Sequence, residues 1–202
     1  MEVKVFKSGL LQTNTYLVIK ENNCIVIDPA FAYDKITRYI DKYKLRLLGV
    51  LLTHGHFDHI ADASDVADKY NCKIYIAKND LELIFDSHIN GSKKYLRKDI
   101  TIPKTRVAAF DKEIIMRLDN FLVDVLFTPG HSKGSCCYRI GNELFTGDTL
   151  FEDGFGRVDL YGGSQEDLNK SLKYIFSLNN DTVVFPGHGD DTTIGEERKR
   201  YI

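Results

Sequence analysis

The chain has 202 residues, of which 43% are hydrophobic, and this predicts one domain over residues 1–202 with a substantial core. Its 27 basic and 29 acidic side chains give a formal net charge of −2, which predicts no general attraction to nucleic acid or anionic lipid and favours a small-molecule substrate. No apolar run approaches the roughly 20 residues of a membrane span, and the N-terminus lacks the apolar segment of a signal peptide, so we expect a cytoplasmic protein.

The first half of the chain predicts strands that alternate with helices. Short apolar runs predict strands over 2–7, 14–20, 23–28, 47–53 and 73–77. Apolar residues at helical spacing predict helices over 32–44 and 61–71. Residues 78–107 are polar and become basic, which predicts a short helix and a loop that could lie over a site.

The second half predicts an antiparallel meander followed by a helix and a strand. The strands are expected over 112–118, 121–128, 136–140 and 143–147. The helix is expected over 164–178, with Ser164 as its N-cap, and a last strand over 182–186. Sheets must bury their apolar faces, so we expect an α+β fold with two packed sheets and helices outside.

The four cysteines, Cys24, Cys72, Cys136 and Cys137, show no CxxC spacing. Neighbours on a strand point to opposite faces, so the last pair suits neither a disulfide scaffold nor a thiolate zinc site. We expect buried, reduced thiols.

A dense group of metal-ligating side chains follows the strand predicted at 47–53, in the stretch THGHFDH. Three of the six histidines and one aspartate fall within six positions. Burying such groups together is costly unless something positive lies among them. An HxHxDH pattern would arise by chance about once in two thousand chains of this composition, so the motif is specific.

Four predicted strands end in the same manner, with a histidine or aspartate just past the C-terminal end, usually beside a glycine. The stretches are VLLTHGHFDH, DVLFTPGH, ELFTGD and VVFPGHGD. If the strands lie side by side, their ends gather one set of donors around a point. That set is His54, His56, Asp58, His59, His131, Asp148 and His188.

Imidazole and carboxylate donors without thiolates suit Zn²⁺, Fe or Mn, and seven donors exceed what one tetrahedral ion can use. We therefore expect two divalent metal ions, with Zn²⁺ favoured over Fe or Mn. Alternate residues project together, so His54 and His56 should bind one ion, joined by His131. The second ion is expected on Asp58, His59 and His188, with Asp148 bridging both.

Such a metal pair lowers the pKa of a shared water toward about 7, supplies hydroxide at neutral pH and holds the leaving group as a Lewis acid. The expected chemistry is hydrolysis. Asp58 lies in both the motif and the second ligand set, and it is our candidate catalytic residue, orienting the hydroxide and later carrying a proton.

With these residues the sequence resembles the metallo-β-lactamase superfamily, whose pattern is HxHxDH followed by His, a bridging Asp and His. It is most similar to the glyoxalase II-like (hydroxyacylglutathione hydrolase-like) enzymes in their short bacterial form, through THGHFDH, TPGHSKGSCCY, FTGDTLFEDGFGRVDLYGGS and PGHGDDTTIGEER. The resemblance implies a four-layer αβ/βα sandwich of two mixed β-sheets and hydrolysis of thioesters such as S-D-lactoylglutathione. Full-length glyoxalase II also has a C-terminal helical segment that helps hold glutathione, whereas 14 residues follow His188 here. The resemblance therefore supports the metal chemistry of glyoxalase II for this chain more directly than it supports the glutathione substrate.

Three further residues are candidates for substrate binding. Arg157 lies where the family keeps a Gly-Arg-x-Asp segment, and it could anchor a substrate carboxylate or pair with Asp159. Lys133 could reach substrate or only solvent. Tyr161, in a glycine-rich loop, could line a pocket or pack in the core.

Other functions remain as alternatives. The main one is a mononuclear iron enzyme like the persulfide dioxygenases of the same superfamily, which use two histidines and one aspartate. Nuclease activity is disfavoured because the chain has no net basic charge and is shorter than the RNA-processing members. A purely structural zinc site is disfavoured because such sites are usually closed and rich in thiolates.

Overall fold

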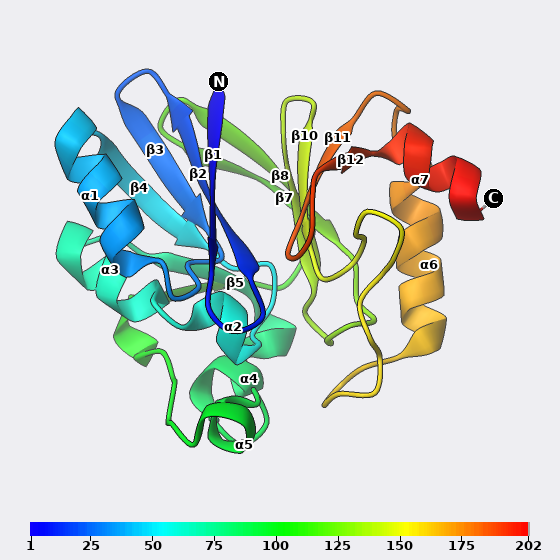
Figure 1. Ribbon diagram of the computed structural model, residues 1–202, viewed down its shortest axis with the longest axis horizontal. Coiled ribbons are helices and arrows are strands. Elements are labelled where there is room, and N and C mark those ends of the chain that lie inside the picture. Colours follow the sequence, from blue (N-terminus) through cyan, green and yellow to red (C-terminus); the bar gives the residue numbers. More distant parts are fainter. Residues whose placement is uncertain (202) are drawn as a thin grey trace.

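Two six-stranded sheets face each other in the computed structural model, which describes residues 1–201 (Figure 1). The first sheet has the order β1-β2-β3-β4-β5-β6. Its strands are β1 Glu2–Ser8, β2 Thr13–Lys20, β3 Asn23–Ile27, β4 Arg46–Leu51, β5 Ile74–Ala77 and β6 Val107–Phe110. The pairs from β1 to β3 are antiparallel and those from β3 to β6 are parallel, so the sheet is mixed.

The second sheet has the order β12-β11-β10-β9-β8-β7 and is antiparallel except between β10 and β11. Its strands are β7 Ile114–Leu118, β8 Phe121–Phe127, β9 Cys136–Ile140, β10 Glu143–Gly147, β11 Val183–Pro186 and β12 Thr192–Thr193. The meander predicted from the sequence is therefore confirmed as β7 to β10.

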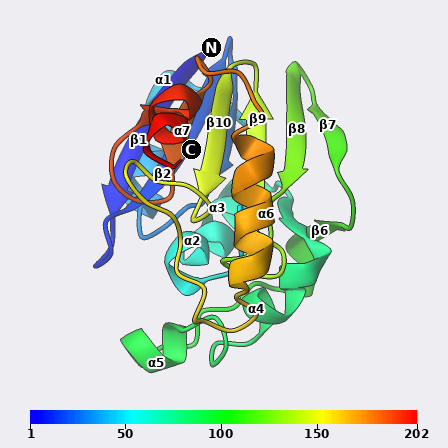
Figure 2. The same cartoon turned by 90° about the vertical axis from the view of Figure 1, so that its right-hand side faces the viewer.

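Helices cover the outer face of each sheet. Helices α1 (Tyr33–Tyr43) and α3 (Ala63–Tyr70) lie outside the first sheet, and α6 (Gln165–Ile175) and α7 (Ile194–Tyr201) lie outside the second (Figures 1 and 2). The predicted N-cap of α6 is confirmed, because the backbone N–H of Asp167 donates to Ser164 Oγ at 3.2 Å. The four-layer sandwich of two mixed sheets predicted from the sequence is confirmed.

The core lies in three clusters, one between the sheets and one beneath the helices on each side. Cys136 belongs to the cluster between the sheets, whereas Cys137 belongs to the cluster beneath α6. The adjacent cysteines thus point to opposite faces as predicted, and all four cysteines are buried and free.

The segment predicted as a short helix and loop holds more regular structure than expected. It contains η1 (Lys78–Asp80), α4 (Leu81–Phe85), α5 (Ser92–Leu96) and η2 (Lys104–Arg106). Helices α4 and α5 lie with α2 (Phe57–Ile60) below the ends of the strands (Figure 1). Strands β6 and β12 and helix α7 were not predicted. Among residues 1–201, no helix combines the length and apolar character needed to cross a bilayer.

Candidate metal centre

The ends of four strands deliver all seven predicted metal donors to one place. His54 and His56 follow β4, and Asp58 and His59 lie on α2 directly after them. Strands β8, β10 and β11, from the other sheet, are followed by His131, Asp148 and His188. The donors therefore meet at the edge shared by the two sheets.

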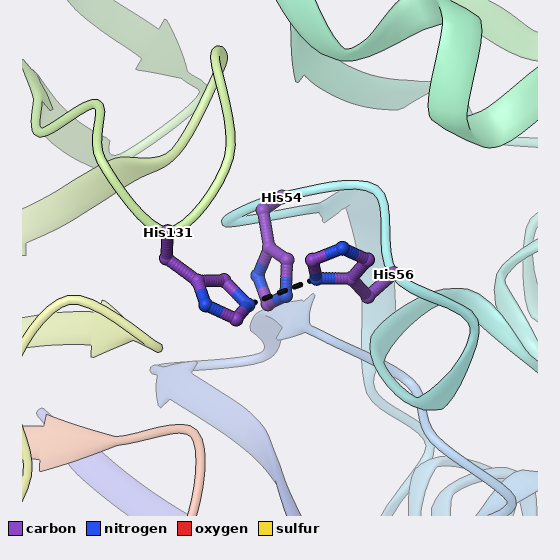
Figure 3. Close-up of side chains that lie close together, drawn as sticks. All are labelled: His54, His56 and His131. Carbon is purple, nitrogen blue, oxygen red and sulfur yellow. Dashed lines mark hydrogen bonds between the residues drawn. The ribbon is translucent and has the colours of Figure 1, made fainter. Parts of the chain in front are cut away.

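One group consists of His54, His56 and His131, which we call the three-histidine set. One ring nitrogen from each lies within 4.8 Å of the others. His56 Nδ1 and His131 Nε2 are 2.9 Å apart, and the three rings point toward one another from two separate loops (Figure 3). All three side chains are buried.

The second group consists of Asp58, His59 and His188, which we call the carboxylate set. Their ligand atoms also lie within 4.8 Å of one another. Asp58 Oδ2 is 3.5 Å from His59 Nε2 and 3.4 Å from His188 Nε2. The side chain of His188 is 24% exposed, so this set is the more exposed of the two.

Asp148 lies between the two sets. Its Oδ1 is 3.2 Å from His59 Nε2 and 3.5 Å from His188 Nε2, and its Oδ2 is 3.5 Å from His131 Nε2. A Cβ at Gly187 would overlap Asp148 Oδ1 and come within 2.7 Å of His59 Cε1, so only glycine fits there. One carboxylate thus faces both groups, as a bridging ligand must.

Outer hydrogen bonds orient the histidine rings. The Nδ1 atoms of His131 and His188 lie 2.7 Å from Arg157 O and 3.1 Å from Leu11 O, and a carbonyl can only accept. Nδ1 of each ring therefore carries a proton, and Nε2 is the atom that faces inward and can ligate a metal ion once it has no proton. Holding the outer nitrogen in this manner is typical of metal-ligating histidines.

Asp28 organises His59 and His54 in the same way. Its Oδ2 lies 2.9 Å from His59 Nδ1 and accepts from Thr53 Oγ1 at 2.6 Å, and its Oδ1 accepts from Thr53 N at 2.8 Å. Because the Thr53 hydroxyl donates to Asp28, it is free to accept from His54 Nδ1 at 3.1 Å. Asp28 lies close to His54 and His59, but its oxygens are already engaged, which favours an orienting role over a ligating one.

Several inward-facing atoms have no hydrogen-bond partner although they are buried. They include the Nε2 atoms of His54 and His59 and Oδ1 of Asp148. Buried polar atoms are nearly always satisfied, and three orphans at one point need a common partner. A divalent cation accepts lone pairs from both nitrogen and carboxylate oxygen, so the residues fit divalent metal ions.

The two sets differ in charge. Burial, with the neighbouring imidazole of His131, lowers the pKa of His56 to about 3, and burial also puts the pKa of His54 well below its usual value. Burial opposes charge on His188 too, but the hydrogen bonds that its ring donates to Asp148 and Asp58 outweigh burial and raise its pKa to about 9. His54 and His56 are therefore neutral donors, whereas the carboxylate set is ionic.

A cavity of about 690 Å³ opens above the donors. Its floor includes donors from both sets, namely His56, His131, Asp58 and His188, with Asp148 between them. Its walls are mostly apolar and come from the β1–β2 turn, α2, α5 and the loop after β10. They include Leu10, Leu11, Phe57, Tyr95, Leu96 and Leu160.

The three predicted substrate residues lie on or near this cavity. Arg157 lines it and forms a two-pronged ion pair with Asp159, with N–O distances of 2.6 and 2.7 Å. Tyr161 lines it and donates through its hydroxyl to Glu82 at 2.7 Å. Lys133 Nζ lies over the ring of Tyr161, 5.1 Å from its centroid, and Lys133 lines a neighbouring groove.

Two buried aspartates near the site were not predicted. Asp28 ends the run NCIVID, the same strand-end pattern that identified the donors, so this pattern could have found it. Asp80 is fully buried behind the three-histidine set, and no spacing in the sequence marks it. Lys94, which also lines the cavity, lies in the segment that was hardest to predict.

Comparison with protein families gives a match over residues 8–188 to the family described as metallo-beta-lactamase superfamily. The chain is 36% identical to the probable metallo-hydrolase YqgX of Bacillus subtilis, covering 94% of this chain and 91% of that protein. It is 31% identical to the hydroxyacylglutathione hydrolase GloC of Haemophilus influenzae, covering 98% and 96%.

Solved structures agree with these relatives. BLEG-1, a B3 metallo-beta-lactamase, superposes with a TM-score of 0.91 at 32% identity, covering 98% of this chain and 97% of that one. TTHA1623 in a di-iron-bound form superposes with a TM-score of 0.84 at 34% identity, covering 98% of this chain and 98% of that one. ETHE1 from Myxococcus xanthus superposes with a TM-score of 0.78 at 28% identity, covering 98% of this chain and 82% of that one.

Proposed function

This chain belongs to the metallo-β-lactamase superfamily and is a metal-dependent hydrolase, and from that premise we propose that it hydrolyses thioesters of the hydroxyacylglutathione type. The observation that carries the proposal is the convergence of seven nitrogen and oxygen donors, five of which lie on the floor of a cavity of about 690 Å³. The similarity to GloC over 98% of the chain supports the choice of thioester.

We propose that the three-histidine set and the carboxylate set each hold one divalent ion, with Asp148 between them. Zn²⁺ is our first choice because the donors are imidazole and carboxylate, and the di-iron form of TTHA1623 keeps iron as the alternative. When bound, two such ions lower the pKa of a shared water toward about 7 and polarise the thioester carbonyl.

Asp58 is our candidate for moving the proton. Burial alone would raise its pKa, but His59 and a hydrogen bond from His188 outweigh burial and leave its pKa below the ordinary value. The carboxylate is therefore ionised, and Thr13 Oγ1 steadies it by donating to Oδ2 at 3.2 Å. It orients the attacking water as an acceptor. As the new C–O bond forms and the C–S bond breaks, the proton passes through Asp58 to the departing thiolate.

We propose that the cavity wall selects the substrate. Its apolar side chains bury the carbon parts of a thioester, and Lys94 places positive charge beside the opening for the carboxylates of a glutathione-like thiol. Arg157 binds a substrate carboxylate by exchanging its present partner, Asp159, for it. Tyr161 forms part of the wall, and Lys133, which lies over its ring, holds it in place.

The test is release of free thiol from S-D-lactoylglutathione by the metal-loaded protein, measured with a thiol reagent. We expect turnover, and we expect it to be lost in His56→Ala and Asp148→Ala while Glu196→Gln, an exposed substitution on α7, keeps the native rate. A fully metal-loaded protein that releases no thiol would contradict the proposal.

The second candidate is a mononuclear iron persulfide dioxygenase. Two histidines and one carboxylate, as in the carboxylate set, are also the donor set of non-haem iron, and the similarity to ETHE1 is compatible with this activity. Oxygen uptake with glutathione persulfide, measured with an electrode, distinguishes the two. Uptake without thioester cleavage would replace the first proposal with the second.

A further inference from the structure

Asp80, at the end of η1, is a buried carboxylate that belongs to neither donor set. Its Oδ2 accepts hydrogen bonds from the backbone N–H of Gly55 at 2.9 Å and from Ser132 Oγ at 2.7 Å. Its Oδ1 accepts from the backbone N–H of Gly134 at 2.6 Å. A single side chain thus receives three donors at full burial.

The three donors belong to the two loops that carry the three-histidine set. Gly55 lies between His54 and His56, and Ser132 directly follows His131. These loops come from different sheets, since one follows β4 and the other follows β8. The carboxyl group of Asp80 therefore ties together the two chain segments whose separation sets the distance between His56 and His131.

This connection is closely packed. A Cβ at Gly134 would come within 2.7 Å of Asp80 N and 2.8 Å of Oδ1, so the loop lies directly on the aspartate. Ser132 Oγ also lies 2.8 Å from Ser135 Oγ, which links both ends of the second loop to the same carboxylate. Little room remains for either loop to move independently.

The carboxylate set is attached differently. Within residues 1–201, the hydrogen bonds of the Asp80 carboxyl group reach none of Asp58, His59 or His188. His59 is oriented by Asp28 instead, and His188 by the carbonyl of Leu11. Asp80 therefore supports only the three-histidine set, whereas Asp28 reaches His59 directly and His54 through Thr53.

Ionisation of the Asp80 carboxyl group is also unfavourable in its buried position. Burial raises its pKa above the usual value although Ser132, Gly134 and Gly55 donate to it. A buried charge without a cation beside it costs stability, and this cost is consistent with a role other than stabilising the fold.

We propose that Asp80 is a positioning residue for the three-histidine set alone, so that metal binding there depends on Asp80 while metal binding at the carboxylate set does not. The inference rests on the metal centre in the proposed function and is independent of the substrate.

The experiment is a titration of the metal-free protein with Co²⁺ alone, monitored by calorimetry and by proton NMR. Native protein is expected to bind two ions. Asp80→Asn is expected to bind one with native affinity and the other about 10- to 100-fold more weakly, the usual effect of losing an outer partner of a metal ligand. In Asp80→Asn with one equivalent of Co²⁺, the imidazole N–H signals shifted by the paramagnetic ion should come from His59 and His188. Shifted signals from His54, His56 and His131 should be missing.

Glu197→Gln is the matched control, because Glu197 is also fully buried and also accepts from a backbone N–H and a hydroxyl, those of Asp153 and Thr192. It should bind both ions as the native protein does. Ser132→Ala removes only one of the three donors and should weaken the same ion several-fold, so it provides the test if Asp80→Asn does not fold.

Native affinity for both ions in a folded Asp80→Asn, judged by near-ultraviolet circular dichroism, would overturn the proposal. Equal weakening of both ions would overturn it as well. Because the probe is Co²⁺ and no thioester is present, failure of the thioesterase proposal leaves this result unaffected.

Discussion

The two donor sets lie side by side and differ in charge, in access and in support. The three-histidine set is the more deeply buried, and burial lowers the pKa values of His54 and His56. The carboxylate set is ionic and opens toward the cavity through His188. We infer a division of labour, in which the three-histidine set is the buried anchor and the carboxylate set is the more accessible to water and substrate.

The largest effect on both donor sets is expected from substitution of Asp148, which lies between them. Asp148→Ala should abolish high-affinity binding of both ions and lower kcat/KM by about 10³-fold, because the bridging carboxylate and its negative charge disappear together. Elemental analysis and thiol release measure the two effects. Asp148→Asn keeps the size of the side chain, and near-native metal content in this variant would contradict a bridging role.

Substitution of one histidine in either donor set should remove the metal ion of that set alone. His56→Ala should leave one ion on the carboxylate set, and His188→Ala should leave one ion on the three-histidine set, each with a loss of about 10²-fold or more in affinity for the missing ion. Calorimetric titration of the metal-free variants counts the remaining sites. Loss of both ions from either variant would show that the sets do not bind metal independently.

Asp28 provides a comparison with Asp80 from the other side of the centre. Asp28→Asn should weaken the ion of the carboxylate set about 10- to 100-fold, because His59 loses the partner of its Nδ1. Unfolding of the metal-free protein should also become easier by about 1–3 kcal/mol, because the amide keeps an acceptor for Thr53 N and Thr53 Oγ1 loses its acceptor at Oδ2. Denaturant unfolding measures this second effect, and unchanged stability would argue against the network.

The smallest expected effect concerns the cavity rim. Lys94 lines the cavity, whereas its neighbour Lys93 pairs with Asp99 at 2.7 Å. Lys94→Gln should raise KM for S-D-lactoylglutathione about 3- to 10-fold at low salt and leave kcat unchanged, and the difference should shrink at high salt. Lys93→Gln is the matched control. An unchanged KM in Lys94→Gln would remove this residue from the proposed binding site.

The convergence of the seven candidate metal donors could be predicted from sequence because local order specifies it. His54 to His59 are close in the chain, and His131, Asp148 and His188 each follow an apolar strand, so the pattern of strand ends places them together. Asp28 follows the same rule. Asp80 does not, because its role arises only when η1 packs against two loops 25 and 54 residues away.

The remaining elements were missed for a similar reason. Strand β6 consists of VAAF at a sheet edge, and β12 has only two residues, so neither carries a periodic pattern long enough to recognise. Helix α7 holds the highly charged run EERKR, which shows no broad apolar stripe. In each case tertiary packing, rather than local preference, decides the structure.

The most direct test of the dinuclear centre is the metal content of the purified protein, measured by elemental analysis alongside its protein concentration. The account predicts close to two divalent ions per chain, falling to about one in His56→Ala and in His188→Ala. A single iron per chain in the native protein, unchanged by loading with excess Zn²⁺, would contradict it.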